Sequence, residues 1–272
     1  MKIRLSIALA TALAAGAACD VRVNEGGVSL DVSDGGRAEA ESTQTYPLAK
    51  GGHIDLDTDN GDIKLDRATG TAVEVSVLRR ARGRTDDAAR EFLSQQNFTI
   101  DAAPDRLTIR SVKATGPDAS QRRVRNDYSI RVPVGAVVTI KDERGAVRMN
   151  DVDGTFTIRS TSGHIEGQRV TGPLDIENVN GGVVMEMAAV TGNVRIKTIN
   201  GGVIMGLPTT ANATIEATTI NGGVHVNESL PLKSLNRDRQ RLSATLGAGT
   251  GPRIELQTTN GGVILGGGEA PK

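Results

Sequence analysis

Five aspartates between residues 55 and 66 have the residue type, and part of the spacing, of a calcium-binding loop. Calcium prefers oxygen ligands, and carboxylates stand here at loop positions one, three, five and twelve. Gly61, however, falls one place later than the glycine of that loop, and the carboxylates alternate with apolar Ile54 and Leu56 as outward residues of a strand do. A solvated strand is therefore the favoured interpretation and a calcium site the alternative. The five residues are Asp55, Asp57, Asp59, Asp62 and Asp66.

Other candidates for catalysis or metal binding are few. His53, His164 and His225 have no second His or Cys at metal-ligand spacing. Ser162 stands beside Gly163 and His164, but no Gly-x-Ser-x-Gly elbow surrounds it. A carbohydrate-active β-helical enzyme is the alternative, although its sugar-stacking aromatics would have to come from two Tyr and three Phe. We therefore predict a protein that is not an enzyme, with no catalytic residue, metal ligand or cofactor.

The N-terminus has the pattern of a secretion signal. Lys2 and Arg4 precede an apolar run over residues 3–13, and small residues follow up to the only cysteine, Cys19. We predict a signal peptide over residues 1–18 and lipidation of Cys19, with ordinary cleavage just before it as the alternative. The protein would then be exported to the cell envelope and anchored in a membrane, facing the periplasm or the cell surface.

Composition narrows the class of protein. The formal net charge is zero, so no long-range field would recruit nucleic acid. Aromatic residues make up 2% of the chain and Trp is absent, whereas globular cores draw much of their buried area from aromatics. Thin stacked layers filled by Ile, Val, Leu and Met suit this composition better.

An Asn-Gly-Gly-Val motif recurs along the chain, mostly at steps of 18–21 residues. Around each copy, apolar residues stand seven and five places before the first glycine and two and four places after it, which is strand periodicity on both sides of a turn. Asn-Gly pairs tolerate positive φ at low cost, so the chain can reverse sharply there. Equivalent asparagines could also stack into a hydrogen-bonded ladder. The predicted turn ladder comprises Asn60, Gly61, Asn180, Gly181, Asn200, Gly201, Asn221, Gly222, Asn260 and Gly261.

We predict an all-β fold, a single-stranded β-solenoid of rungs of about 18–21 residues. A meander of antiparallel hairpins is the structural alternative, because Asn-Gly between apolar strands is also a hairpin signal. Opposite charges in successive copies favour parallel stacking. The two charge series are Asp175, Arg195 and Glu216, and Arg159, Glu177 and Lys197.

The remaining segments complete the predicted organisation. A polar tether spans residues 19–48 and the strand-repeat domain residues 49–268. That domain carries an insertion at about 79–126 with a short helix at Thr85–Gln96, which Thr85 can cap. A Pro-containing basic loop is expected over residues 228–241.

Two stretches resemble a known family. Val132-Pro133-Val134-Gly135 followed by repeated glycine turns, and the ending from Leu246 to Val263, are similar to the bacterial adhesin-like family of strand repeats, whose function is unknown. The resemblance covers roughly residues 47–267. It implies a β-solenoid-like fold, export to the envelope and no established catalytic residues.

Apolar residues also stand where the chain should face outward. Adjacent rungs would line them into a stripe that either another segment of the chain covers or a partner binds. The stripe comprises Val179, Val184, Ile199, Ile204, Ile220 and Ile264. The predicted function is a non-catalytic structural, adhesion or interaction module of the envelope. Its partner would be an envelope protein or polymer, and self-association through end rungs is a further prediction.

Overall fold

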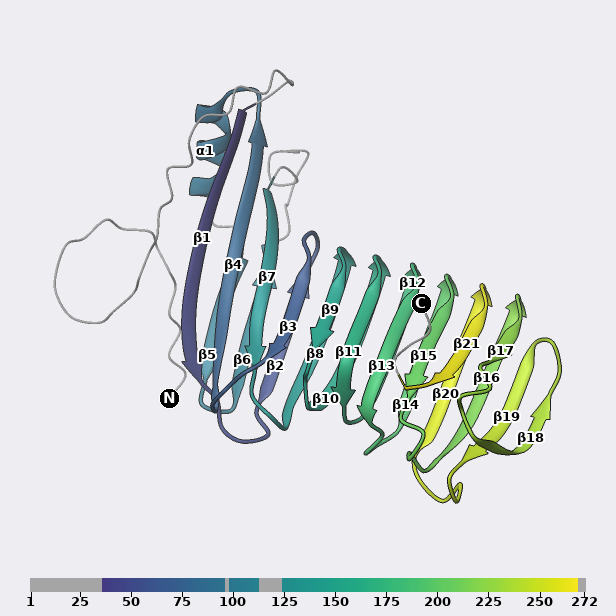
Figure 1. Ribbon diagram of the computed structural model, residues 1–272. Helices are drawn as coiled ribbons and strands as arrows, with labels where there is room; N and C mark the ends of the chain where they lie inside the picture. The colour runs from purple at the N-terminus through teal and green to yellow at the C-terminus, as the bar shows by residue number, and fades with distance from the viewer. Residues whose placement is uncertain (1–35, 96–97, 113–123, 269–272) are drawn as a thin grey trace.

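The computed structural model describes residues 36–95, 98–112 and 124–268, and in them nearly all regular structure is β-strand (Figure 1). The strands form two open sheets, here called sheet A and sheet B. Sheet A has ten strands, in the order β1 (Gly36–Pro47), β4 (Ala72–Gly83), β7 (Val124–Val132), β3 (Ile63–Arg67), β9 (Val147–Asn150), β11 (Ile165–Thr171), β13 (Val183–Ala189), β15 (Val203–Leu207), β21 (Val263–Gly267) and β17 (Val224–Val226). Sheet B has eleven, in the order β18 (Leu232–Arg237), β19 (Arg241–Leu246), β16 (Ala213–Asn221), β20 (Arg253–Asn260), β14 (Val194–Asn200), β12 (Leu174–Asn180), β10 (Gly154–Ser162), β8 (Ala136–Arg144), β2 (His53–Thr58), β6 (Arg106–Ser111) and β5 (Phe98–Ala103).

Each repeat contributes one strand to each sheet, and the turn at the motif glycine, Asn-Gly-Gly in most repeats, joins the two. Strands of neighbouring repeats pair in parallel and in register, so that Leu174 lies beside Val194 in sheet B and Val183 beside Val203 in sheet A. The solenoid-like, nearly all-β architecture is therefore confirmed. The alternative of an antiparallel meander is wrong for the repeats, because their strands pair in parallel. Equivalent positions of neighbouring motifs therefore lie beside each other.

The core lies between the sheets and consists of the four apolar columns that the sequence predicts. Residues seven and five places before the motif glycine are buried in every rung, as are those two places after it. Gly167 interrupts the fourth column, and there the Met185 side chain occupies the space that a Cβ on Gly167 would need. Leu, Ile, Val and Met thus fill the core, as expected from the scarcity of aromatics.

The order of the rungs in space differs from their order in the chain. The last repeat, β20–β21, lies between β14–β15 and β16–β17, as Figure 1 shows for β21. At the other end β2–β3 lies between β6–β7 and β8–β9. The expected charge series through Arg195 is therefore wrong in its last member, since Glu255 and not Glu216 lies beside Arg195. Glu216 pairs with Arg253 at 2.8 Å.

Antiparallel strands close one end of the stack. The segment predicted as a basic loop over residues 228–241 instead contains β18, which forms a hairpin with β19 against β16. The tip of this hairpin bonds to the last turn, where the Val224 amide donates to the Arg239 carbonyl at 3.0 Å. This local β-structure was missed because its side chains lack the repeat pattern.

At the opposite end β1 and β4 extend sheet A beyond sheet B, and α1 (Asp86–Ser94) packs on the extension. Residues 36–47, the last part of the predicted tether, are thus a strand and not a linker. The helix prediction is confirmed. Thr85 caps α1, its hydroxyl accepting from the Ala88 amide at 3.2 Å, and Ala89 and Leu93 are buried.

The predicted signal peptide, Cys19 and the tether up to residue 35 lie outside the described residues. Within the described part, the chain has no helix with both the length and the apolar character needed to cross a bilayer.

Candidate functional site

The Asn-Gly turns lie side by side along one edge of the two sheets, and we call this edge the turn ridge. Four of its asparagines form a continuous side-chain ladder in the spatial order Asn180, Asn200, Asn260, Asn221. Each amide nitrogen donates to the preceding amide oxygen at 2.8 Å. The ladder stops where Ser162 and Arg144 take the asparagine position, and Asn60 lies beyond them. Each amide along the run satisfies its neighbour.

The glycines of the ridge are required mainly by the closeness of neighbouring turns. A Cβ on Gly201 would lie 2.1 Å from the carbonyl oxygen of Gly181, although Gly201 has no positive φ. Gly181 has a φ of 145° and the same kind of contact, 1.9 Å from the Gly163 oxygen. Backbone bonds join the turns as well, such as the Gly181 amide to the Asn200 carbonyl at 2.9 Å. Positive φ, the reason for glycine that the sequence predicts, applies at only some of these positions.

Beneath the ridge runs a column of buried polar residues, two places before the asparagine column. Strand alternation points these side chains inward, and each is less than a tenth exposed. The buried polar column comprises Thr58, Asp142, Ser160, Asn178, Thr198, Thr258 and Thr219. This column is not among the predicted site residues, although the sequence carries a signal for it: every copy has a small polar residue at a position that strand alternation places inside.

The column satisfies the carbonyl groups of the turns. The hydroxyls of Thr198, Thr258 and Thr219 each donate to the carbonyl of a glycine in the neighbouring turn, at 3.2, 2.7 and 2.7 Å. The Asn178 amide donates at 3.0 Å to both Gly163 and Gly181. Buried carbonyls without a donor would cost stability, so these contacts hold the ridge closed.

Asp142 differs from the rest of the column because it carries a carboxyl group. The residue is 4% exposed and both carboxyl oxygens are buried; among the described residues they have no hydrogen bond of ordinary geometry, and the donor that faces them is the Arg144 amide. Burial raises the pKa of Asp142 to about 7; the Arg144 amide opposes this rise, and the charges of Asp62, Asp59 and Glu143 add to it.

The predicted apolar stripe is split into two rows, one on each side of the ridge. Val179, Ile199 and Ile220 lie on the outer face of sheet B, and Val184, Ile204 and Ile264 on the outer face of sheet A. We call these the sheet B row and the sheet A row. Thr259 separates Ile199 from Ile220, because the last repeat lies between theirs.

The sheet B row is the more exposed of the two. Val179 is 38% exposed, Ile199 41% and Ile220 63%, whereas the sheet A row is half-buried. Only six large hydrophobic side chains are exposed in the described ranges, and three of them make this row. A charged network lies beside it on the same face, in which Arg195 pairs with Glu177 at 3.0 Å and Arg159 with Glu177 at 3.3 Å.

The aspartates of residues 55–66 do not converge on one point. Asp55 pairs with Arg106, Asp62 with Arg125 at 2.7 Å and Asp66 with Lys64 at 2.8 Å. Burial acts to raise the pKa of Asp62, but the Ala146 amide and Arg125 outweigh it and hold that pKa below its ordinary value. These carboxylates are therefore balanced by cationic side chains, which favours the solvated-strand interpretation over calcium.

A family comparison matches residues 50–265 to the model described as Toastrack DUF4097, which is most of the chain. The chain belongs to the Toastrack family. This confirms the resemblance drawn from the glycine turns and the closing repeat. No curated protein matches the chain.

Solved structures are similar to this chain at low sequence identity. A candidate cell adhesion protein from Clostridium sporogenes aligns with a TM-score of 0.50 and 11% identity, covering 85% of this chain and all of that one. A candidate adhesin from Bacteroides fragilis aligns with a TM-score of 0.32 and 10% identity, covering 84% of this chain and 96% of that one. At 11% identity, the similarity to the Clostridium structure concerns the fold alone.

The remaining candidates in this Toastrack chain are scattered. His164 and His225 are exposed and His53 is half-buried, each on a different strand or turn. Among the described residues, no three His, Cys, Asp or Glu side chains are grouped so as to hold a metal ion. Ser162 lies on the ridge, in the position that asparagine takes in other rungs.

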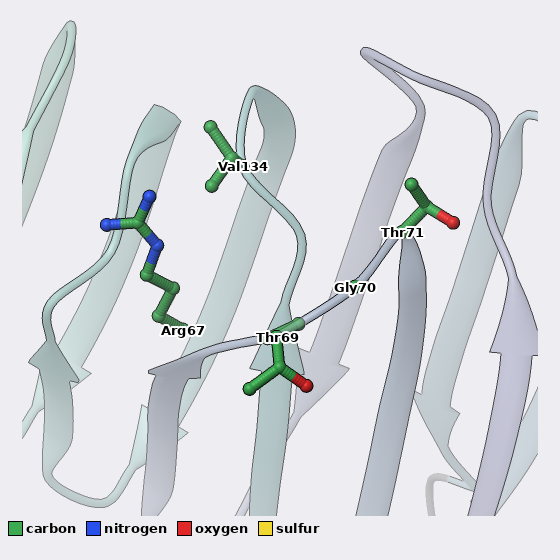
Figure 2. A pocket seen from close by; sticks show the side chains of 6 residues that line it. Arg67, Thr69, Gly70, Thr71 and Val134 are labelled. Atoms are coloured by element: carbon green, nitrogen blue, oxygen red, sulfur yellow. The ribbon is translucent and has the colours of Figure 1, made fainter.

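A shallow hollow of about 510 Å³ lies away from the ridge. Figure 2 shows that its lining comes from two places: Arg67 at the end of β3 with the connection that follows it up to Thr71, and Val134 in the connection after β7. Arg67 is its only charged lining residue, and the two threonines are exposed. The hollow therefore offers neither a nucleophile with a base nor a pair of carboxylates.

Proposed function

We propose that this Toastrack protein is a non-catalytic module of the bacterial cell envelope that binds a protein or polymer through the sheet B row. The observation that carries the proposal is the exposure of Val179, Ile199 and Ile220 on the outer face of sheet B, in a row that only Thr259 interrupts. Isolated exposed apolar residues are ordinary, but a line of them marks a contact surface. The flanking charges of Arg159, Glu177 and Arg195 are paired with one another, so they would form a polar rim around an apolar centre.

Export and anchoring form the second part of the proposal. The charged, apolar and small-residue pattern of residues 1–18 supports secretion, and Cys19 supports acylation of the mature N-terminus. The similar structures from Clostridium and Bacteroides are described as candidate adhesion proteins, which agrees with a place in the envelope. A tethered stack would present its ridge and faces to molecules near the membrane.

Crosslinking pull-down from membranes tests the binding surface. The test variant replaces Val179, Ile199 and Ile220 with Thr. Threonine is β-branched and favourable in strands, as Val and Ile are, but it is polar. The matched control replaces the three exposed hydrophobics outside the row, Val112, Val134 and Leu235, with Thr. We expect the wild type and the control to capture the same partner and the test variant to lose it. Capture that survives the row substitutions would overturn the proposal.

The anchor has its own test. Cys19→Ser should release the protein from membranes into the soluble fraction, because the acyl group on Cys19 is the only membrane anchor proposed. Full membrane retention of Cys19→Ser would show that the anchor is wrong while leaving the binding surface untouched. Specific turnover of an envelope glycan, abolished by a single substitution, would instead favour the carbohydrate-active alternative.

A further inference from the structure

The buried polar column has one member that does not match the chemistry of its neighbours. Thr198, Thr258, Thr219 and Asn178 each donate a hydrogen bond to a turn carbonyl. Asp142 takes the same place in its own rung, in register with Thr58 on one side and Ser160 on the other. An ionised carboxylate can only accept hydrogen bonds, so it cannot replace these donors.

The turn carbonyl that corresponds to Asp142 belongs to Gly61. A Cβ built on Gly145 would lie 1.8 Å from the Gly61 oxygen and 3.5 Å from Asp142 Oδ2, so the carboxyl group and this carbonyl border the same small space. Both oxygens of Asp142 are buried, and the donor that faces them is the Arg144 amide, which favours the ionised form. An ionised carboxylate and a carbonyl oxygen are both acceptors, so placing them side by side in a buried site is unfavourable.

We propose that Asp142 carries a proton in the folded protein and donates it as a hydrogen bond to the Gly61 turn, so that the rungs β2–β3 and β8–β9 are joined by a proton-dependent latch. The proton converts the one anionic member of the column into a donor like the threonines. Losing it leaves a buried charge beside a carbonyl oxygen and weakens the stack at these two rungs. The inference does not depend on the proposed partner-binding function.

The surrounding charges support a protonated Asp142. On its own strand Glu143 is acidic, and from the neighbouring rung Asp59 and Asp62 add negative charge. The nearby arginines Arg125 and Arg148 pair with Asp62 and not with Asp142, Arg125 at 2.7 Å and Arg148 at 3.8 Å. The latch carboxyl is thus buried next to acids, and it has no ion pair with any cation in the described part of the chain. Burial is the largest cause of its pKa of about 7; the Arg144 amide opposes the rise, and these acidic charges add to it.

The sign of the pH effect follows from this raised pKa. Between the ordinary Asp value of 3.8 and about 7, the folded state holds a proton at Asp142 that the unfolded chain has released. Stability contributed by the latch is therefore full below the unfolded value and is lost as pH rises toward the folded one. One proton gives a slope of up to about tenfold in the folding equilibrium constant per pH unit.

Urea unfolding of the whole chain at several pH values tests the latch. Three proteins are compared: the wild type, Asp142→Asn, which imitates the protonated group, and Asp142→Thr, the residue of most other rungs. We expect the wild-type folding constant to fall relative to both variants by up to about tenfold per pH unit between pH 5 and pH 7. Other titrating groups cancel in this comparison. Parallel pH profiles for all three proteins would overturn the proposal.

A second measurement uses the wild type alone, so it survives a failure of either variant to fold. The carbon-13 shift of the Asp142 carboxyl should report a protonated group at pH 5.5 that titrates near neutrality. A carboxyl already ionised at that pH would refute the latch. Stabilisation of the wild type by calcium at pH 7.5, absent in Asp142→Asn, would also refute it, since the carboxylate would then bind a cation in place of a proton.

Discussion

At the scale of single residues, the motif glycines and asparagines serve the stack itself. Neighbouring turns approach so closely that a methyl group on Gly201 would overlap the Gly181 carbonyl oxygen. The side-chain amide of Asn200 donates a hydrogen bond to the side-chain oxygen of Asn180 at 2.8 Å. The most regular residues of the sequence are therefore explained by backbone packing, and the residues available to a partner are those between the turns.

Gly201→Ala provides a stability test of this explanation. The added Cβ must displace backbone at 2.1 Å, so we expect a loss of about 1–3 kcal/mol in the free energy of unfolding. Urea denaturation measures it. Gly70→Ala is the matched control, because a Cβ there meets no atom within 4 Å and the residue has no positive φ. Its effect should stay within about 0.5 kcal/mol. Equal effects at the two positions would contradict a packing role for the ridge glycines.

At the scale of strands and helices, much of the fold could be predicted from periodicity. The four core columns follow from alternation around each glycine, and the helix follows from Thr85 and its apolar face. The rung order could not be predicted, because the motifs at Gly201, Gly222 and Gly261 are nearly identical, so each can stack on any other. The site was predicted in part: the apolar residues were found, but which of them share a face depends on the two-sheet geometry.

The helix cap gives a prediction at this scale. Thr85→Ala removes the acceptor for the Ala88 amide, which should cost about 1 kcal/mol of local stability. Because α1 packs in a small cluster apart from the main core, we expect the loss to remain local. Hydrogen exchange over residues 86–94 should become about fivefold faster, while exchange in β12 and β14 is unchanged. Uniform acceleration throughout the chain would contradict the independence of this cluster.

At the scale of the whole molecule, antiparallel strands modify both ends of the stack. The hairpin of β18 and β19 lies at one end of sheet B, and β1 at the opposite end of sheet A carries Arg37, Glu39 and Glu41 on its outer face. Charged and irregular edges discourage strand addition. We therefore expect the soluble Cys19→Ser protein to sediment as a monomer over a wide concentration range. Growth in mass with concentration would support the end-to-end association predicted from the repeats alone.

The proposed binding surface depends on the position of the last repeat, which lies inside the stack and not at its end. Because β20 lies between β14 and β16, Thr259 interrupts the sheet B row and Glu255 lies beside Arg195. Cysteine pairs in a Cys19→Ser background test this position directly. In sheet B, Lys197 and Thr218 lie on opposite sides of Gln257, each in register with it. Neighbouring strands lie about 4.8 Å apart, within the Cα range of a disulfide, and next-nearest strands about 9.6 Å apart, outside it.

Oxidation should therefore link Lys197→Cys to Gln257→Cys and should not link Lys197→Cys to Thr218→Cys. Stacking in chain order would give the reverse, because the rung of Lys197 would then lie directly beside the rung of Thr218. Disulfide formation in the second pair without the first would contradict the rung order, and with it the arrangement of the proposed binding row.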